Sequence, residues 1–355
     1  MQIPHFEALQ PVCPVCKTAN GQLHPLVIAQ VAKQEGPHIV EAVLHCTNAA
    51  CKREYPVIDG VPLIISDIRR YLSENAFQIA LRDDLSEVME SILGDCIGPG
   101  AIFDIVRQHL SSYAWDHYGD LDPMEDPIDP EPGAMTRVLH TALDSIADDP
   151  EGPLIDLGCS VGRSSFDLAD RCGQMVLGVD LNFPMLRMAS QLLRTGIVRY
   201  PRRRVGVVYD RREFSAEMPS AKMVDFWACD ALALPFADGS FAGAVSMNML
   251  DCVASPVDFL VALARSLCER AFAIVACPYD WSNAATPMEH WLGGHSQRGP
   301  DDGASDSVLR HLLDPSSVHA IDGLHLLHEM EVDWQVRVHA RSTMSYKSHL
   351  VIAGT

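Results

Sequence analysis

The chain has 355 residues, of which 48% are hydrophobic and 21% are charged, and its formal net charge is −20. These values are typical of a globular protein with a large core, and the acidity disfavours nucleic acid as a partner because a negative surface repels phosphate. The longest apolar stretches are too short to span a bilayer, and no basic region followed by an apolar segment opens the sequence. We therefore expect no membrane partner, no signal peptide and a cytoplasmic location.

Two close cysteine pairs define the first module, which we predict over residues 1–70. The pairs lie in CPVC and CTNAAC, on either side of two predicted strands over 23–33 and 38–46. Two such turns can place four thiolates tetrahedrally around Zn²⁺, which leaves no open position for water and predicts a structural site. The expected zinc ligands are Cys13, Cys16, Cys46 and Cys51.

The residues after the second pair, CKREYPVIDGVPLIIS, resemble the end of the short zinc-ribbon proteins that accompany or activate certain methyltransferases. The resemblance implies a docking or scaffolding role. Small ribbons cannot build a sufficient core alone, so metal binding is expected to supply their folding energy.

Residues 71–150 are predicted to be mainly helical. Apolar residues recur at helical spacing over 73–94, 101–115 and 134–148. The acidic, proline-rich stretch DLDPMEDPIDPEPG predicts a surface loop or linker. This segment is also a candidate lid over an active site.

From residue 151 to 355, strand and helix patterns alternate, which predicts a mostly parallel sheet covered on both faces. Ligands of such sheets bind beyond the carboxyl ends of the strands. The predicted strands cover 153–158, 174–180, 224–230, 241–249, 271–278, 324–332 and 348–354.

The first of these strands ends in a turn rich in small residues, within LIDLGCSVGRSSFDLA. Gly158, Ser160 and Gly162 allow a ligand to approach the backbone closely. Asp156 suits a ligand that carries an ammonium group, and Asp180, at the end of the second strand, can accept hydrogen bonds from two ribose hydroxyls. These features alone indicate either a methyltransferase or a dinucleotide enzyme.

The third and fourth strands favour the methyltransferase. FWACDALALPFADGSFAGAVSMNML resembles the corresponding strands of class I methyltransferases, which implies that Asp230 holds the adenine amino group and Ala231 offers its amide. The predicted fold is therefore an α/β class I (Rossmann-like) methyltransferase with a seven-stranded, mostly parallel sheet. The expected S-adenosylmethionine site comprises Asp156, Gly158, Ser160, Gly162, Arg163, Asp180, Leu181, Asp230, Ala231 and Asn248.

Four further strings resemble the C-terminal methyltransferase domain of ovothiol synthases, over about residues 110–355. They are DLGCSVGRSSFDLA, NMLDCVASPVDFL, CPYDWSNAATPMEHWLGG and VRVHARSTMSYKSHLVIAG. That domain methylates an imidazole nitrogen of 5-thiohistidine, so the resemblance implies a small histidine-derived substrate. Those enzymes also carry an iron-dependent sulfoxide-synthase portion, in whose place this sequence has the zinc ribbon. We expect this chain only to methylate, with 5-thiohistidine, a selenium analogue or another imidazole as acceptor.

Methyl transfer from a sulfonium requires alignment of the methyl carbon with the acceptor lone pair, and an imidazole must be neutral at the attacking nitrogen. Asn248 and Asp251 are the first candidates to fix the acceptor's tautomer, although they could instead cap a loop and a helix. Tyr279, the third candidate catalytic residue, could add a hydroxyl and wall the acceptor ring with Trp281, or the pair could simply pack in the core. Trp291, in HWLGG, indicates either a mobile flap or a plain turn.

An amino-acid acceptor also carries a carboxylate, for which arginine is the best partner. Arg337 and Arg341, with His339 between them, would share one face of a strand, although that face could also be solvated. Tyr118, before the fold begins, could touch the methionine carboxylate or pack in the core.

A basic cluster lies between residues 194 and 212. It could form a solvated hairpin that balances acidic neighbours, or it could contact an anion or RNA. An RNA- or protein-directed methyltransferase that docks its substrate through this cluster and the zinc ribbon is the alternative to the small-molecule enzyme, and a non-catalytic nucleoside-binding protein is the third possibility. The cluster comprises Arg194, Arg199, Arg202, Arg203, Arg204, Arg211 and Arg212.

Overall fold

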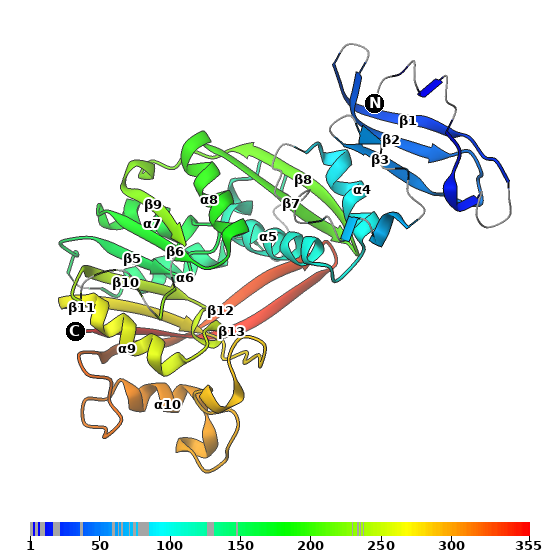
Figure 1. Ribbon diagram of the computed structural model, residues 1–355. Coiled ribbons are helices and arrows are strands. Elements are labelled where there is room, and N and C mark those ends of the chain that lie inside the picture. The colour runs from blue at the N-terminus through cyan, green and yellow to red at the C-terminus, as the bar shows by residue number, and fades with distance from the viewer. Residues whose placement is uncertain are drawn as a thin grey trace. The chain divides into compact units, whose positions relative to one another are not determined.

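The computed structural model (Figure 1) describes residues 11–16, 22–35, 38–58, 85–125, 131–146, 148–228, 230–232, 234, 236 and 238–355, with scattered positions between 3 and 76. The chain divides into two compact units. The first comprises Met1–His109, Pro201–Arg211 and His339–Arg341, and the second comprises Leu110–Tyr200, Arg212–Val338 and Ser342–Thr355. Parts of the predicted helix over 73–94 and of the proline-rich loop lie outside the described residues.

The first unit contains a small antiparallel sheet with its strands in chain order. The strands are β1 (Leu26–Glu35), β2 (His38–Cys46), β3 (Glu54–Ile58) and β4 (Val61–Pro62). Ile39, Leu44 and Tyr55 are fully buried beneath it. Helix α4 (Glu87–Ile97) begins where the Ser86 side chain accepts the amide hydrogen of Met89, a cap that satisfies an otherwise free donor.

The second unit contains the predicted mostly parallel sheet of seven strands. Its order is β12-β13-β11-β10-β5-β6-β9. The strands are β5 (Leu154–Leu157), β6 (Val176–Asp180), β9 (Val224–Ala228), β10 (Phe241–Met247), β11 (Leu267–Cys277), β12 (His325–His339) and β13 (Ser342–Gly354). Neighbours from β9 to β11 pair in parallel, whereas β13 is antiparallel to β11. This arrangement confirms the class I methyltransferase fold.

Helices cover the sheet in two separate apolar clusters. One cluster takes side chains from α5 (Ile102–Tyr118), α6 (Ala134–Leu143), α7 (Arg163–Cys172) and α8 (Phe183–Thr195). The other takes them from α9 (Pro256–Ser266) and α10 (Ser305–Leu312). Strand β5 is buried along its whole length, and three of its four residues are apolar, as expected for a central parallel strand covered on both faces; the exception is Asp156.

Strands β7 (Ile197–Val205) and β8 (Val208–Ser215) form a separate two-stranded sheet. Short 3-10 helices cover Gly119–Leu121, Ala221–Met223, Leu250–Cys252, Met288–His290 and Pro300–Gly303. Among the described residues, none of the helices combines the length and apolar character needed to cross a bilayer.

Candidate functional site

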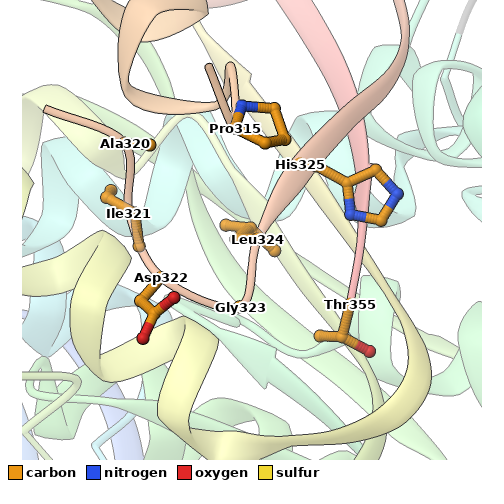
Figure 2. A pocket seen from close by; sticks show the side chains of 8 residues that line it. All are labelled: Pro315, Ala320, Ile321, Asp322, Gly323, Leu324, His325 and Thr355. Carbon is orange, nitrogen blue, oxygen red and sulfur yellow. The ribbon is translucent and has the colours of Figure 1, made fainter. Parts of the chain in front are cut away.

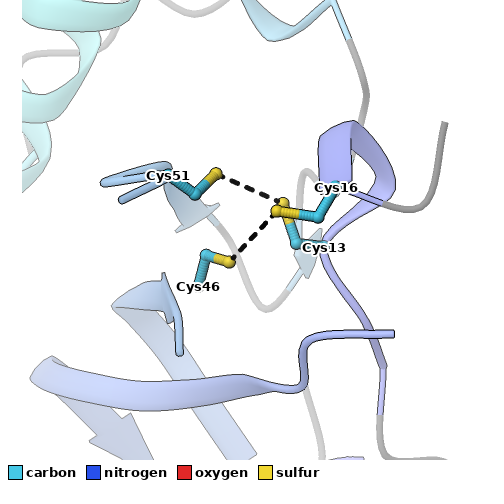
Figure 3. Close-up of side chains that lie close together, drawn as sticks. All are labelled: Cys13, Cys16, Cys46 and Cys51. Atoms are coloured by element: carbon cyan, nitrogen blue, oxygen red, sulfur yellow. Dashed lines mark hydrogen bonds between the residues drawn. The ribbon is translucent and has the colours of Figure 1, made fainter. Parts of the chain in front are cut away.

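The four predicted zinc ligands converge (Figure 3). Their sulfur atoms all lie within 4.8 Å of one another, and the Cys13–Cys51 and Cys16–Cys46 sulfur pairs are each 3.8 Å apart. A tetrahedron with Zn–S bonds of about 2.3 Å has sulfur–sulfur edges of about 3.8 Å, so the cluster fits one Zn²⁺. Each of the four cysteines supplies one thiolate, and this closed set indicates a structural ion.

Two polar groups surround the zinc ligands. The Tyr55 hydroxyl lies 3.2 Å from the sulfur of Cys13, and the backbone amide of Asn48 donates to the sulfur of Cys46 at 3.4 Å. Donors of this kind stabilise thiolate charge and orient the ligands. Tyr55 is fully buried, so one side chain both packs in the ribbon core and contacts the cysteine cluster.

The turn after β5 has the backbone geometry that a closely approaching ligand requires. Gly158 and Gly162 have φ values of 77° and 91°, and Ser160 has a φ of 53°. A Cβ atom on Gly158 would lie 2.6 Å from the sulfur of Met249, so a larger residue would be both strained and crowded there.

Asp156 lies beneath this turn and is almost fully buried. Its Oδ2 atom accepts hydrogen bonds from the hydroxyls of Ser164 and Ser165, each at 2.6 Å. Burial raises the pKa of Asp156 to about 6, against the two hydroxyl hydrogen bonds, which lower it. The carboxyl therefore anchors the start of α7, and its contact with the donor's ammonium group stays a prediction.

The raised pKa of Asp156 predicts a pH dependence of stability. Protonation of Asp156 stabilises the folded state, because the folded protein holds this proton more tightly than the unfolded chain does. This stabilisation is fully present below the pKa of Asp156 in the unfolded chain, and it is lost as the pH rises through about 6. Between pH 5 and pH 7.5 we expect Asp156 to lower the free energy of unfolding by about 1.4 kcal/mol. Urea unfolding of wild type and Asp156→Asn at both pH values measures the difference. Equal pH dependence in the two proteins would contradict the prediction.

Asp180 ends β6 and organises the same turn. Its two oxygens accept the amide hydrogens of Ser160 at 2.9 Å and Asn182 at 2.8 Å. Leu181 follows it with 70% of its surface exposed, unlike most large apolar residues of this unit. A carboxylate beside an uncovered apolar side chain fits the ribose and the adenine face of S-adenosylmethionine.

The adenine end of the predicted site is described in part. Asp230 is exposed, and its Oδ1 atom accepts the amide hydrogen of Leu232 at 2.9 Å, whereas Ala231 is buried. Cys229, Ala233, Pro235 and Ala237, which belong to the motif that favoured the methyltransferase, lie outside the described residues. The roles of Asp230 and Ala231 stay predictions.

Arg163 has a different role from the expected one. Its guanidinium donates to Asp167 at 2.7 Å, to both carboxylate oxygens of Asp120 and to the carbonyl of His117 at 3.0 Å. These partners tie the first turn of α7 to the end of α5. The side chain positions the turn, because its donors are already used by the protein.

Tyr118 also differs from the expectation of a substrate contact. Its ring is completely buried, and its hydroxyl donates to the carbonyl of Val161 at 2.7 Å. The alternative, core packing, is the one observed. The physical reason is that the hydroxyl satisfies a carbonyl in the turn that lies under the helix, where water cannot reach it.

The loops after β10 and β11 bring two predicted catalytic residues to the sheet's carboxyl edge. Asn248 has a φ of 51°, and its side-chain oxygen accepts a hydrogen bond from Ser348 at 3.1 Å. Asp251 is buried and accepts the amide hydrogen of Asp280 at 2.8 Å. Burial raises the pKa of Asp251.

The three predicted aromatic residues form a row. The ring of Trp281 lies 6.2 Å from that of Tyr279 and stacks on that of Trp291, with centroids 5.9 Å apart and planes at 15°. The indole of Trp291 donates to the carbonyl of Thr286, and Leu292 beside it is buried. The loop that was expected to be a flap or a turn is thus anchored on both sides of Trp291.

Two residues that the sequence interpretation left unassigned lie with these groups. His349 and Glu329 join Tyr279 through hydrogen bonds. No local pattern marks them, because they lie on strands far from Tyr279 in the sequence.

The predicted carboxylate-binding residues are divided between the two units. Arg337 belongs to the second unit, whereas His339 and Arg341 belong to the first, where the ring of His339 accepts the amide hydrogen of Arg341 at 3.2 Å. Their role toward a substrate carboxylate stays a prediction.

The arginine cluster lies largely on β7 and β8 and has acidic partners, as the hairpin interpretation expects. The Arg194 side chain lies outside the described residues. The ion pairs join Arg199 to Glu213, Arg204 to Asp210, Arg211 to Glu90, and Arg212 to Asp122.

A pocket at the other end of the sheet is shown in Figure 2. Thr355, at its rim, is hydrogen-bonded to Ala271 in β11, six residues before that strand ends at Cys277. Six strand residues span about 20 Å, so the pocket is remote from the carboxyl edge. It is lined by Pro315, Ala320, Ile321, Asp322, Gly323, Leu324, His325 and Thr355.

A seven-stranded sheet, a glycine-rich turn after its first parallel strand and an aspartate at the end of the next define a class I methyltransferase. Residues 155–275 match a family described as a methyltransferase domain, and residues 12–60 match Trm112p-like proteins. The chain is an S-adenosylmethionine-dependent methyltransferase that carries a zinc-ribbon module. No curated protein matches its sequence significantly.

Solved structures with a similar fold include other methyltransferases. A SAM-dependent methyltransferase from Methanosarcina mazei is 19% identical, with 61% of this chain and 96% of that chain covered and a TM-score of 0.38. Geranyl diphosphate C-methyltransferase from Streptomyces coelicolor is 14% identical, with coverage of 62% and 78% and a TM-score of 0.40. Phosphoethanolamine N-methyltransferase 2 from Haemonchus contortus is 18% identical, with coverage of 40% and 28% and a TM-score of 0.32.

Proposed function

We propose that this enzyme N-methylates the imidazole ring of a small histidine derivative, 5-thiohistidine or its selenium analogue. The observation that carries the proposal is the aromatic row of Tyr279, Trp281 and Trp291 at the edge that also holds Asn248 and Asp251. Stacked rings provide a flat apolar wall for a heteroaromatic acceptor. The ovothiol-synthase resemblance of the same segments supports this choice.

In this proposal the polar groups fix the acceptor. Asn248 and Asp251 orient the acceptor so that the ring nitrogen with the free lone pair faces the methyl carbon. The carboxylates of Asp251 and Asp280 favour a cationic substrate group such as an α-ammonium. Arg337, His339 and Arg341 remain the candidates for its carboxylate.

A macromolecular substrate is the second candidate function, and the Trm112p-like module favours it. The ion pairs of the arginine cluster count against RNA, because phosphate would have to displace carboxylates that already neutralise these side chains. We therefore favour the small molecule.

The test is turnover of S-adenosylmethionine with 5-thiohistidine, followed by mass spectrometry, which should reveal a product heavier by one methyl group. Asp251→Asn should lower kcat about 100-fold, since it retains the acceptor for the Asp280 amide but removes the charge that orients the acceptor. Asp238→Asn, an exposed residue paired with Arg265, is the matched control. Turnover of another acceptor class, with none of any histidine derivative, would contradict the proposed function.

A further inference from the structure

A chain of hydrogen bonds leads away from the Tyr279 hydroxyl. The Tyr279 Oη atom lies 2.8 Å from Nδ1 of His349, and Nε2 of His349 lies 2.8 Å from Oε2 of Glu329. The Nε atom of Arg310 donates to both oxygens of Glu329 at 2.9 Å, and the Nη1 atom of Arg310 donates to Asp306 at 2.7 Å. The series thus joins the loop after β11 to β13, β12 and α10.

The charge of Glu329 sets the direction of these hydrogen bonds. Burial raises the pKa of Glu329, but the hydrogen bonds from His349 and Arg310 outweigh it and lower the pKa below its usual value. A charged carboxylate only accepts, so His349 must donate from Nε2, and Nδ1 of the neutral ring carries a lone pair. The Tyr279 hydroxyl therefore donates to Nδ1, and its own oxygen lone pairs are left to accept from a ligand.

The location of the series connects it to the site. His349 is buried, and it pairs across the sheet with Cys277, the last residue of β11. Tyr279 follows two residues later with a φ of 55°, beside the ring of Trp281. The residue before His349, Ser348, holds Asn248. The hydrogen-bond series therefore ends at the edge where the acceptor is expected.

We propose that Tyr279 is a catalytic residue that receives the proton released on N-methylation, and that His349 and Glu329 are positioning residues that take up the proton of its hydroxyl. This inference rests on the proposed function. The attacking nitrogen bonds to the methyl carbon as the sulfur–methyl bond breaks, which leaves S-adenosylhomocysteine and a methylimidazolium. The proton on its other nitrogen passes to Tyr279 Oη, the Tyr279 proton passes to His349 Nδ1, and Glu329 balances the imidazolium charge.

The surroundings of Tyr279 explain why its hydroxyl needs a hydrogen-bonded base such as His349. Burial raises the pKa of Tyr279 far above neutrality, so the hydroxyl cannot act as a preformed anion. The other charged groups that face it are Asp306 and Arg310 from α10 and Glu331 from β12. Transfer through His349 avoids a buried tyrosinate, as hydroxyl–imidazole–carboxylate series do in other enzymes.

The first test uses S-adenosylmethionine with 5-thiohistidine. Tyr279→Phe should lower kcat about 100-fold and Glu329→Gln about 10-fold, whereas the affinity for S-adenosylmethionine stays unchanged. Asp333→Asn, which changes an exposed carboxylate four residues along β12, is the matched control and should stay within about twofold. With a ring-N-alkylated thiohistidine, which has no ring proton to lose, wild type and Tyr279→Phe should react equally fast. A Tyr279→Phe enzyme with undiminished kcat on 5-thiohistidine would overturn the proposal.

The second test needs no turnover and separates this inference from the proposed function. In ¹⁵N NMR of the ligand-free protein, His349, assigned by its absence in His349→Gln, should show the Nε2–H tautomer. Glu329→Gln should shift the His349 signals. An Nδ1–H tautomer would reverse the hydrogen bond to Tyr279 and refute the relay, whatever substrate the enzyme takes. Failure of the wild type to methylate 5-thiohistidine would instead refute the proposed function.

Discussion

Cys16→Ser is expected to abolish stoichiometric zinc binding and to unfold the ribbon. The cysteine sulfurs lie at the spacing of one ZnS₄ tetrahedron, and Cys16 is buried beside a small core in which the described residues include Leu44 and Tyr55. Structural zinc contributes on the order of 10 kcal/mol to the folding of such small modules, which exceeds what this core can replace.

Zinc content by atomic emission and protection of the β1–β2 amides in hydrogen exchange measure this effect. Cys268→Ser, which lies outside the cluster, is the control and should retain both the zinc and the protection. S-adenosylmethionine binding should persist in Cys16→Ser, because the turn residues that we expect to form its site all belong to the second unit. Full zinc occupancy in Cys16→Ser would contradict the four-cysteine site.

Asp180→Ala is expected to weaken S-adenosylmethionine binding by about 100-fold or more. The variant removes the expected charged acceptor for the ribose hydroxyls, and hydrogen bonds to charged groups contribute roughly 1.5–3 kcal/mol each. It also removes the acceptor that holds the amide of Ser160, where φ is positive, so the ligand-binding turn loses its support.

Isothermal titration calorimetry with S-adenosylmethionine measures the change. Asp333→Ala removes an exposed carboxylate from β12 and should bind as the wild type does. An unchanged Kd in Asp180→Ala would show that the ribose is held elsewhere.

Features that depend on local pattern and short spacing are predictable from the amino-acid sequence. Cys13 and Cys16 are separated by one tight turn, so their convergence needs no knowledge of the rest of the chain. The parallel strands β5, β6, β9, β10 and β11 are predictable because buried parallel strands are mainly apolar, and the turn at Gly158 is predictable because positive φ values favour glycine.

Contacts between side chains that are distant in the sequence depend on the three-dimensional fold. Arg163 and Tyr118 carry the chemistry of ligand-binding residues, but their partners, Asp120 and Val161, are distant in sequence and use up their hydrogen bonds. The link between Tyr279 and His349 depends on the antiparallel register of β11 and β13, in which Cys277 faces His349. A change of register by one residue would turn His349 to the opposite face, and no local pattern specifies that register.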